Sequence, residues 1–232
     1  PGVVGGGRGK ECAVGAGNVF CGVAGDAEWA VEGCPEAARA GASWVVLCDT
    51  NGGSLPAEIR AGVEAVLQGL GELDRPVGIG IHCHNDCELA VANTLEGVAA
   101  GADMVQGTIN GYGERCGNAN LVSVVANLVL KLGIEALQSE SLGRATDLSR
   151  TVPEIANPAL PLQQPYVGYG AFAHKGGQHV AAVPKHSDAY QHIDPSPAGN
   201  APPDLVPDLP GRGTIHAQTR AVGLEPGPHE PP

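Results

Sequence analysis

Residues 77–86 read VGIGIHCHND, an apolar run that ends in two histidines separated by one cysteine. Two more apolar runs also lead into polar and glycine-rich residues: WVVLC at 44–48 precedes DTNGG, and DMVQGT at 103–108 precedes NGYGER at 110–115. Apolar runs of this length predict buried strands. Helical patterns separate them, at residues 28–40, 54–70, 88–100 and 118–132. The alternation predicts an α/β fold with a parallel sheet, either open and doubly wound or closed as a (β/α)8 barrel. Both place functional residues just after the strands.

The composition excludes several classes of protein. The chain has 232 residues, of which 43% are hydrophobic and 16% charged, which indicates a folded protein. Its net charge of −12 argues against binding to nucleic acid or to an anionic membrane. No apolar run reaches the roughly 18 residues that span a bilayer. The seven scattered cysteines are an odd number and form no disulfide framework, so a reducing compartment, the cytoplasm, is expected.

Three zones divide the chain. Residues 1–26 hold nine glycines, and residues 27–160 carry the alternating strands and helices. Residues 161–232 are rich in proline, which favours an extended segment or linker. The first residue is Pro1 rather than Met, and no secretory signal follows it, so we expect a processed chain or a fragment.

The strongest local signal for chemistry is the pair His82 and His84. Residues two apart on a strand point to the same face, so both imidazoles enter one pocket while Cys83 points away. Neutral imidazole is a common ligand of divalent metals. The alternative is a pair of partly buried, hydrogen-bonded histidines.

Two other polar segments supply further candidates. Asn118 offers an amide oxygen to a metal or, alternatively, caps the helix that follows it. Glu114 and Arg115 pair with each other on a loop in the simplest interpretation. Thr50 offers a hydroxyl to a substrate carboxylate, whereas an ordinary turn before a helix explains the neighbouring Asp49.

These motifs together resemble a known family. The resemblance is carried by CDTNGG at 48–53, GIHCHND at 80–86, QGTINGYGERCGNANL at 106–121, YVG at 166–168, AFAHKGGQH at 171–179, YQHIDP at 190–195 and DLPGR at 208–212. They are similar to the citramalate synthase branch of the isopropylmalate/homocitrate synthase family, which is HMG-CoA lyase-like and belongs to the DRE-TIM metallolyases. The similarity extends over about residues 19–225.

The resemblance implies a (β/α)8 TIM barrel that condenses acetyl-CoA with pyruvate to give (R)-citramalate and CoA, in the synthesis of isoleucine. It implies a divalent metal (Mg²⁺, Mn²⁺ or Zn²⁺) bound by His82, His84 and Asn118. Thr50 and Arg115 match substrate-binding positions, and we assign catalytic roles to Glu114 and His179. In relatives the histidine matching His179 serves the partner subunit's site, so a homodimer is implied.

Departures from the family pattern keep alternatives open. The Asp-Thr-Thr-Leu-Arg-Asp-Gly-like first strand, which supplies a metal-binding Asp and a catalytic Arg, has no match here. The chain is therefore expected to be the C-terminal half of the barrel followed by a post-barrel segment. One alternative is 2-isopropylmalate or homocitrate synthesis, and another is a truncated fragment with no catalysis of its own.

Overall fold

A computed structural model describes residues 15–19, 27–138, 140–174 and 190–201. The chain divides into two compact units, residues 1–128 and 129–232. In the described part of the chain, no helix combines the length and the apolar character needed to cross a membrane.

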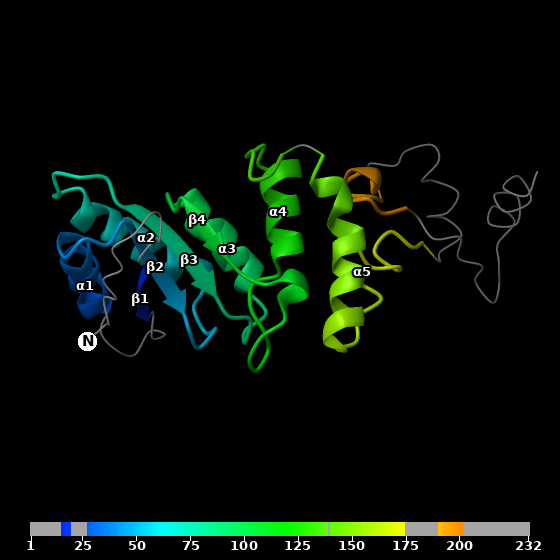
Figure 1. The fold of residues 1–232 in the computed structure, drawn as a ribbon, viewed down its shortest axis with the longest axis horizontal. Helices are drawn as coiled ribbons and strands as arrows, with labels where there is room; N and C mark the ends of the chain where they lie inside the picture. Colours follow the sequence, from blue (N-terminus) through cyan, green and yellow to red (C-terminus); the bar gives the residue numbers. More distant parts are fainter. Residues whose placement is uncertain (1–14, 20–26, 139, 175–189, 202–232) are drawn as a thin grey trace, which may run out of the picture. The chain divides into compact units, whose positions relative to one another are not determined.

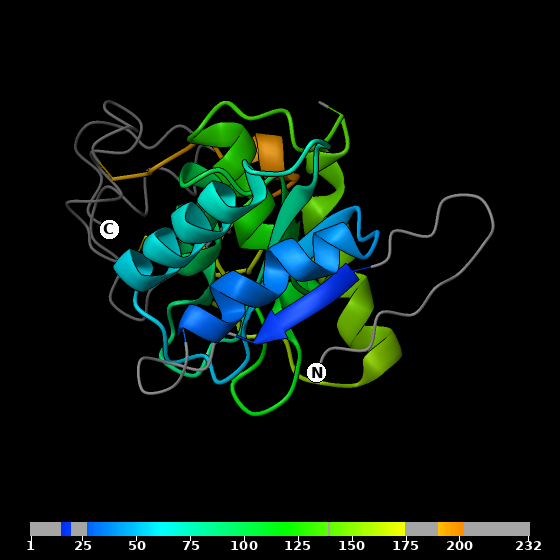
Figure 2. The same cartoon turned by 90° about the vertical axis from the view of Figure 1, so that its left-hand side faces the viewer.

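The first unit is built around a parallel sheet of four strands, which lie in the order β1-β2-β3-β4 (Figure 1). The strands are β1 (Gly15–Val19), β2 (Trp44–Asp49), β3 (Gly78–Cys83) and β4 (Met104–Gln106). Helices α1 (Ala27–Arg39), α2 (Pro56–Leu70) and α3 (Ala90–Ala99) connect them, and α2 packs against both α1 and α3 (Figures 1 and 2). The predicted α/β class and parallel sheet are confirmed.

The core of this unit lies between the sheet and its helices. Alternate residues of the two central strands pack with one apolar side of α2, and all are fully buried: Val45, Leu47, Ile79, Ile81, Ile59, Val63 and Val66. Since side chains alternate along a strand, the intervening positions point to the opposite face. Cys83 therefore packs in the helix-side core, while His82 and His84 share the other face. The packing of the helices thus fixes which side of the sheet carries the histidines.

The predicted strands and helices of residues 28–132 are confirmed, with ends that differ by at most three residues. One strand was not predicted. Strand β1, with the sequence GAGNV, lacks an apolar run and is instead held by parallel pairing to β2. Helix α2 begins after Leu55 rather than at Ser54, and the Leu55 N–H donates to Glu58 Oε2 at 2.8 Å.

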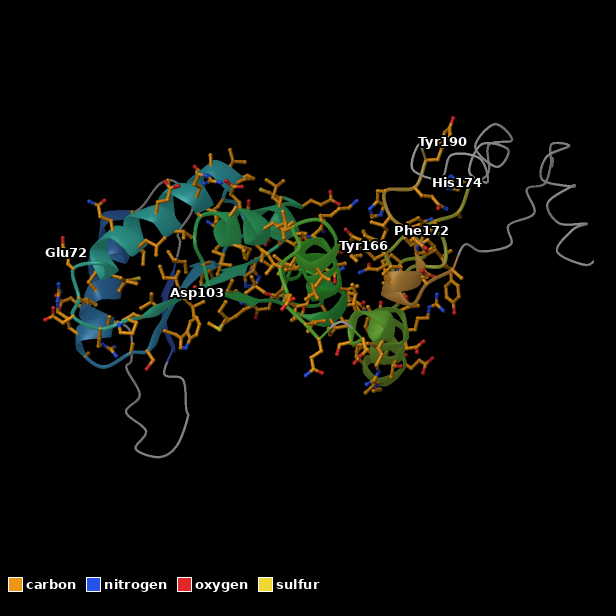
Figure 3. The ribbon with its side chains drawn as sticks, turned by 90° about the horizontal axis from the view of Figure 1, so that it is seen from above. Glu72, Asp103, Tyr166, Phe172, His174 and Tyr190 are labelled. Atoms are coloured by element: carbon orange, nitrogen blue, oxygen red, sulfur yellow. The ribbon has the colours of Figure 1, made fainter. Side chains whose placement is uncertain are left out.

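The second unit contains the unpredicted helix α5 (Ala145–Ala156). Helix α4 (Leu121–Leu130) precedes it and crosses the boundary between the units. Short 3₁₀ helices lie at Leu142–Arg144 and Ser196–Ala198, and Thr146 Oγ1 donates to the Ala198 carbonyl at 2.7 Å. Phe172, labelled in Figure 3, stacks on His192 with ring centroids 5.9 Å apart.

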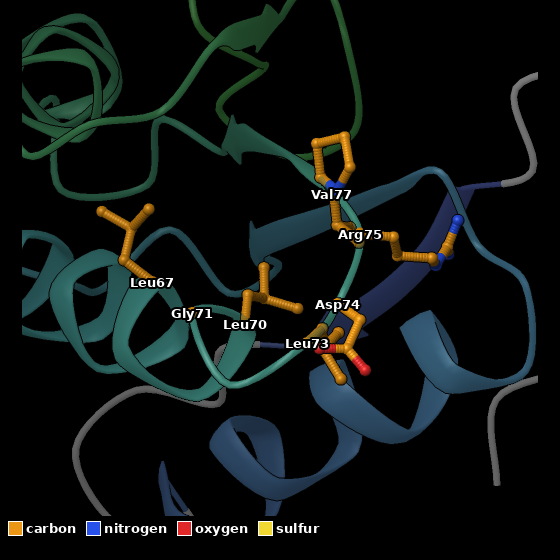
Figure 4. A pocket seen from close by; sticks show the side chains of 8 residues that line it. Leu67, Leu70, Gly71, Leu73, Asp74, Arg75 and Val77 are labelled. Carbon is orange, nitrogen blue, oxygen red and sulfur yellow. The ribbon is translucent and has the colours of Figure 1, made fainter.

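A shallow pocket of about 450 Å³ lies in the first unit, in the segment that leads from α2 into β3 (Figure 4). Its lining includes Leu67, Leu70, Arg75 and Val77. It lies before the amino end of β3, whereas the predicted site residues follow the carboxyl ends of the strands. No predicted site residue lines this pocket.

Candidate active site

The three polar loops of the first unit follow the carboxyl ends of neighbouring strands. Cys48 on β2 pairs in register with His82 on β3, and His82 pairs with Gln106 on β4. Because the strands are parallel and in register, the loops that follow them meet at one edge of the sheet. The predicted meeting point of the polar segments is therefore confirmed.

The structure brings His82 and His84 together as predicted. Their ring centroids are 5.2 Å apart, with an angle of 62° between the ring planes. Cys83 between them is fully buried on the opposite face, and burial raises the pKa of its thiol to about 12. The thiol therefore lies in the helix-side core, away from the two imidazoles.

Asn118 lies beside the histidine strand. Its backbone forms an isolated antiparallel bridge with His84, and its amide Nδ2 donates to the Tyr112 carbonyl at 3.1 Å. It does not cap the following helix, because Asn120 Oδ1 accepts the N–H of Val122 at 3.1 Å. The capping alternative for Asn118 is therefore wrong, and its Oδ1 is left available to a ligand.

The donor set fits a divalent metal ion. His84 Nδ1 and Asn118 Oδ1 are among eight buried side-chain atoms of the described residues that lack a hydrogen-bond partner, so both are available to a ligand. Burial and the nearby His84 lower the pKa of His82, while Gln106 and Asn118 partly oppose the shift. A lowered pKa favours the neutral imidazole that binds metals. Two ring nitrogens and an amide oxygen suit a metal that accepts mixed nitrogen and oxygen ligands.

The set is incomplete by itself. Within the described ranges, no group of three or more His, Cys, Asp or Glu side chains is arranged to hold a metal. The three neutral donors supply no negative charge to balance a cation.

Arg115 pairs chiefly with Asp86 rather than with Glu114. Its Nε and Nη2 lie 2.8 and 2.9 Å from the two carboxylate oxygens of Asp86, and Nη2 also donates to the Thr50 carbonyl at 2.8 Å. Glu114 is 3.9 Å away, and its side chain is 86% exposed. The Arg115 guanidinium holds the pKa of the Asp86 carboxyl below its usual range. The simple Glu114–Arg115 pair expected from the sequence is therefore a minor contact.

Thr50 and Glu114 are both solvent-exposed residues of these loops, and their predicted roles stay predictions. His179 lies outside the described residues. Sequence reasoning missed Asp86 and Gln106 as members of the site. The signal for Gln106 was its position near the end of the strand adjacent to His82, and the signal for Asp86 was an acidic residue two positions after His84.

Asp49 is a buried anchor rather than part of an ordinary Asx turn. Its Oδ1 accepts the Ser54 hydroxyl at 3.0 Å and lies 3.4 Å from the Ser54 N–H. Asn93 of α3, also fully buried, donates from Nδ2 to the Ser54 carbonyl at 2.7 Å. This chain of polar contacts ties the loop that carries Thr50 to two helices.

Replacing Asn93 with alanine is expected to lower the free energy of unfolding by about 1.5 kcal/mol, because the buried Ser54 carbonyl loses its donor. Urea unfolding followed by circular dichroism measures the change. The exposed Gln68 of α2 is a suitable control, since Gln68→Ala is expected to change stability by less than about 0.5 kcal/mol. Equal effects of the two variants would show that the Asn93 contact contributes nothing.

The chain is similar to several known proteins. The HMGL-like family model matches residues 9–152. The (R)-citramalate synthase of Aquifex aeolicus is 47% identical over 212 residues, which cover 91% of this chain and 39% of that protein. The homocitrate synthase AksA of Methanopyrus kandleri is 38% identical, over 82% of this chain and 46% of that protein. The chain thus spans about two fifths of the length of the curated relatives it matches.

A solved HMG-CoA lyase from Acinetobacter baumannii superimposes with a TM-score of 0.50 at 23% identity, over 64% of this chain and 50% of that chain. At this identity the match concerns the fold alone: the α/β fold with its parallel sheet is similar to that of an HMG-CoA lyase. With a family model that matches well over half of its residues, this chain belongs to the HMGL-like family.

Proposed function

We propose that this chain forms part of the active site of a citramalate synthase, which converts acetyl-CoA, pyruvate and water into (R)-citramalate and CoA. The observation that carries the proposal is the convergence of His82, His84 and Asn118 with two buried, unpartnered ligand atoms. The identity to five (R)-citramalate synthases is 43–47%, above the 38% found for a homocitrate synthase, which favours pyruvate as the 2-oxo acid.

In this proposal His82, His84 and Asn118 hold a divalent metal. When bound, such an ion supplies Lewis-acid polarisation of a 2-oxo acid carbonyl. Thr50 donates its hydroxyl to the pyruvate carboxylate. Glu114 and His179 exchange the protons of the reaction, at the acetyl methyl group, at the new alkoxide and at the water that hydrolyses the thioester.

In this proposal the chain supplies one half of a complete active site. We propose that the sheet β1–β4 is the C-terminal half of a TIM barrel, that residues 161–232 form a post-barrel segment, and that two copies pair in the intact enzyme. In that arrangement His179 serves the partner subunit's site. Analytical ultracentrifugation tests the pairing, and a monomer at all concentrations would contradict it.

The test of function is the formation of citramalate and CoA, measured together by liquid chromatography and mass spectrometry. With the missing half of the barrel supplied as a second chain, we expect products from acetyl-CoA and pyruvate in the presence of Mg²⁺ or Mn²⁺. We expect none with 2-oxoisovalerate or 2-oxoglutarate, and none when this chain carries His82→Ala. Product from another 2-oxo acid would point to isopropylmalate or homocitrate synthesis. Absence of product from every 2-oxo acid would refute catalysis by this chain.

A further inference from the structure

The guanidinium of Arg115 joins the loops that follow three different strands. It lies on the loop after β4, binds both carboxylate oxygens of Asp86 on the loop after β3, and donates to the Thr50 carbonyl on the loop after β2. A planar guanidinium makes such a set of bonds in fixed directions, which a lysine ammonium does not reproduce.

The backbone at Arg115 is folded to permit these contacts. Its φ of 53° lies in the left-handed region, which arginine rarely adopts. The turn is closed by the Gly117 N–H, which donates to the Glu114 carbonyl at 2.8 Å. An uncommon backbone conformation persists where surrounding contacts hold it, and the bonds to Asp86 and Thr50 are such contacts.

Backbone hydrogen bonds run between the same loops. The Asn85 N–H donates to the Gly117 carbonyl at 2.9 Å, and the Cys87 N–H donates to the Gly52 carbonyl at 3.1 Å. The first bond joins the loops after β3 and β4, which the Arg115–Asp86 pair also joins. The second joins the loops after β2 and β3, which Arg115 connects through the Thr50 carbonyl and Asp86. Their amide protons therefore report whether the loops stay together.

We propose that Arg115 is a positioning residue whose guanidinium fixes the three loops against one another through Asp86 and the Thr50 carbonyl. It thereby sets the spacing between Thr50 and the histidine strand. This role differs from the direct substrate contact predicted from the sequence, because Nε and Nη2 are already engaged by protein oxygens. Only the purpose of this spacing rests on the proposed function; the positioning role of Arg115 does not depend on it.

The test is a double-mutant cycle on the full chain, read by NMR hydrogen exchange at the Asn85 and Cys87 amides. We expect Arg115→Ala and Asp86→Ala each to speed exchange at both amides by about tenfold, and the double variant to add nothing further. Arg115→Lys keeps the positive charge but loses the paired hydrogen bonds of the planar guanidinium, so it is expected to behave like Arg115→Ala. The Ile81 amide in β3 serves as an internal reference that stays unchanged.

Arg60→Ala is the matched control. Arg60 is an exposed arginine that also pairs with a carboxylate across elements, bonding Glu96 from α2 to α3, but it lies away from the three loops. Its removal is expected to leave both amides unaffected. Unchanged exchange in Arg115→Ala, or additive effects in the double variant, would overturn the inference.

Activity separates the two possible roles of Arg115. A positioning role predicts that Asp86→Ala and Arg115→Ala lower kcat/KM for pyruvate by similar factors. A rise in the KM for pyruvate confined to Arg115→Ala would mean direct substrate contact and would refute positioning. If the chain makes no product, the proposed function fails while the exchange experiment still decides the inference.

Discussion

Replacing His84 with alanine is expected to lower the affinity of the chain for Mn²⁺ on the order of 100-fold and to abolish formation of citramalate. His84 supplies one of three converging donors, and its Nδ1 is buried with no hydrogen bond to protein. Removing one donor leaves an imidazole and an amide oxygen, which is too few ligands to retain a divalent ion. Binding is measured by titration with Mn²⁺ alone, with free Mn²⁺ detected by electron paramagnetic resonance.

The fold is expected to survive this change, because His84 follows β3 and is not part of the apolar core. Circular dichroism before and after substitution checks this. His192→Ala is the control: it removes an exposed imidazole in the second unit, which stacks on Phe172. Equal Mn²⁺ binding by wild type, His84→Ala and His192→Ala would show that His82 and His84 are partly buried structural residues and do not bind the metal.

The sequence predicted those parts of the fold that depend on local pattern. Apolar runs such as Trp44–Cys48 lie within the observed strands. A short run of consecutive apolar residues is typical of a strand that is covered on both faces. The spacing of His82 and His84 predicted a shared face, since strand geometry alternates side chains whatever the surrounding fold. The resemblance to the citramalate synthase branch is confirmed by the comparisons.

The predictions that were wrong or missing concern residues whose partners lie elsewhere in the sequence. Ser54 has the residue type of a helix cap, but the buried Asp49 carboxylate takes its hydroxyl. Arg115 finds its main partner in Asp86, 29 positions earlier, instead of in the adjacent Glu114. Strand β1 has a weak intrinsic preference and is stabilised by pairing with β2. In each case tertiary structure outweighs the local preference.

Replacing Gly52 with alanine is expected to lower the free energy of unfolding by about 3 kcal/mol. Gly52 has a φ of +66°, which costs an alanine about 1 kcal/mol. A Cβ there would also lie 2.7 Å from the Asp86 backbone nitrogen and 2.4 Å from its Oδ2. Overpacking against a backbone atom adds roughly 1–3 kcal/mol, because the loop after β3 must move.

Gly53→Ala is the control: it shows whether any alanine in this loop destabilises the protein or only one placed close to Asp86. Its added Cβ would lie 3.2 Å from Oδ1 of Asn51, an exposed side chain that also accepts the Gly53 N–H at 3.0 Å, and a small shift of this exposed contact is expected to cost less than about 0.5 kcal/mol. Urea unfolding followed by the fluorescence of Trp29 and Trp44, the two tryptophans of the chain, reports on the first unit for both variants. Because the added methyl group displaces Asp86, Gly52→Ala should also speed hydrogen exchange at Cys87, as loss of the Arg115 side chain does. A stable Gly52→Ala with normal exchange would mean that the loops after β2 and β3 are not in the close contact on which the site depends.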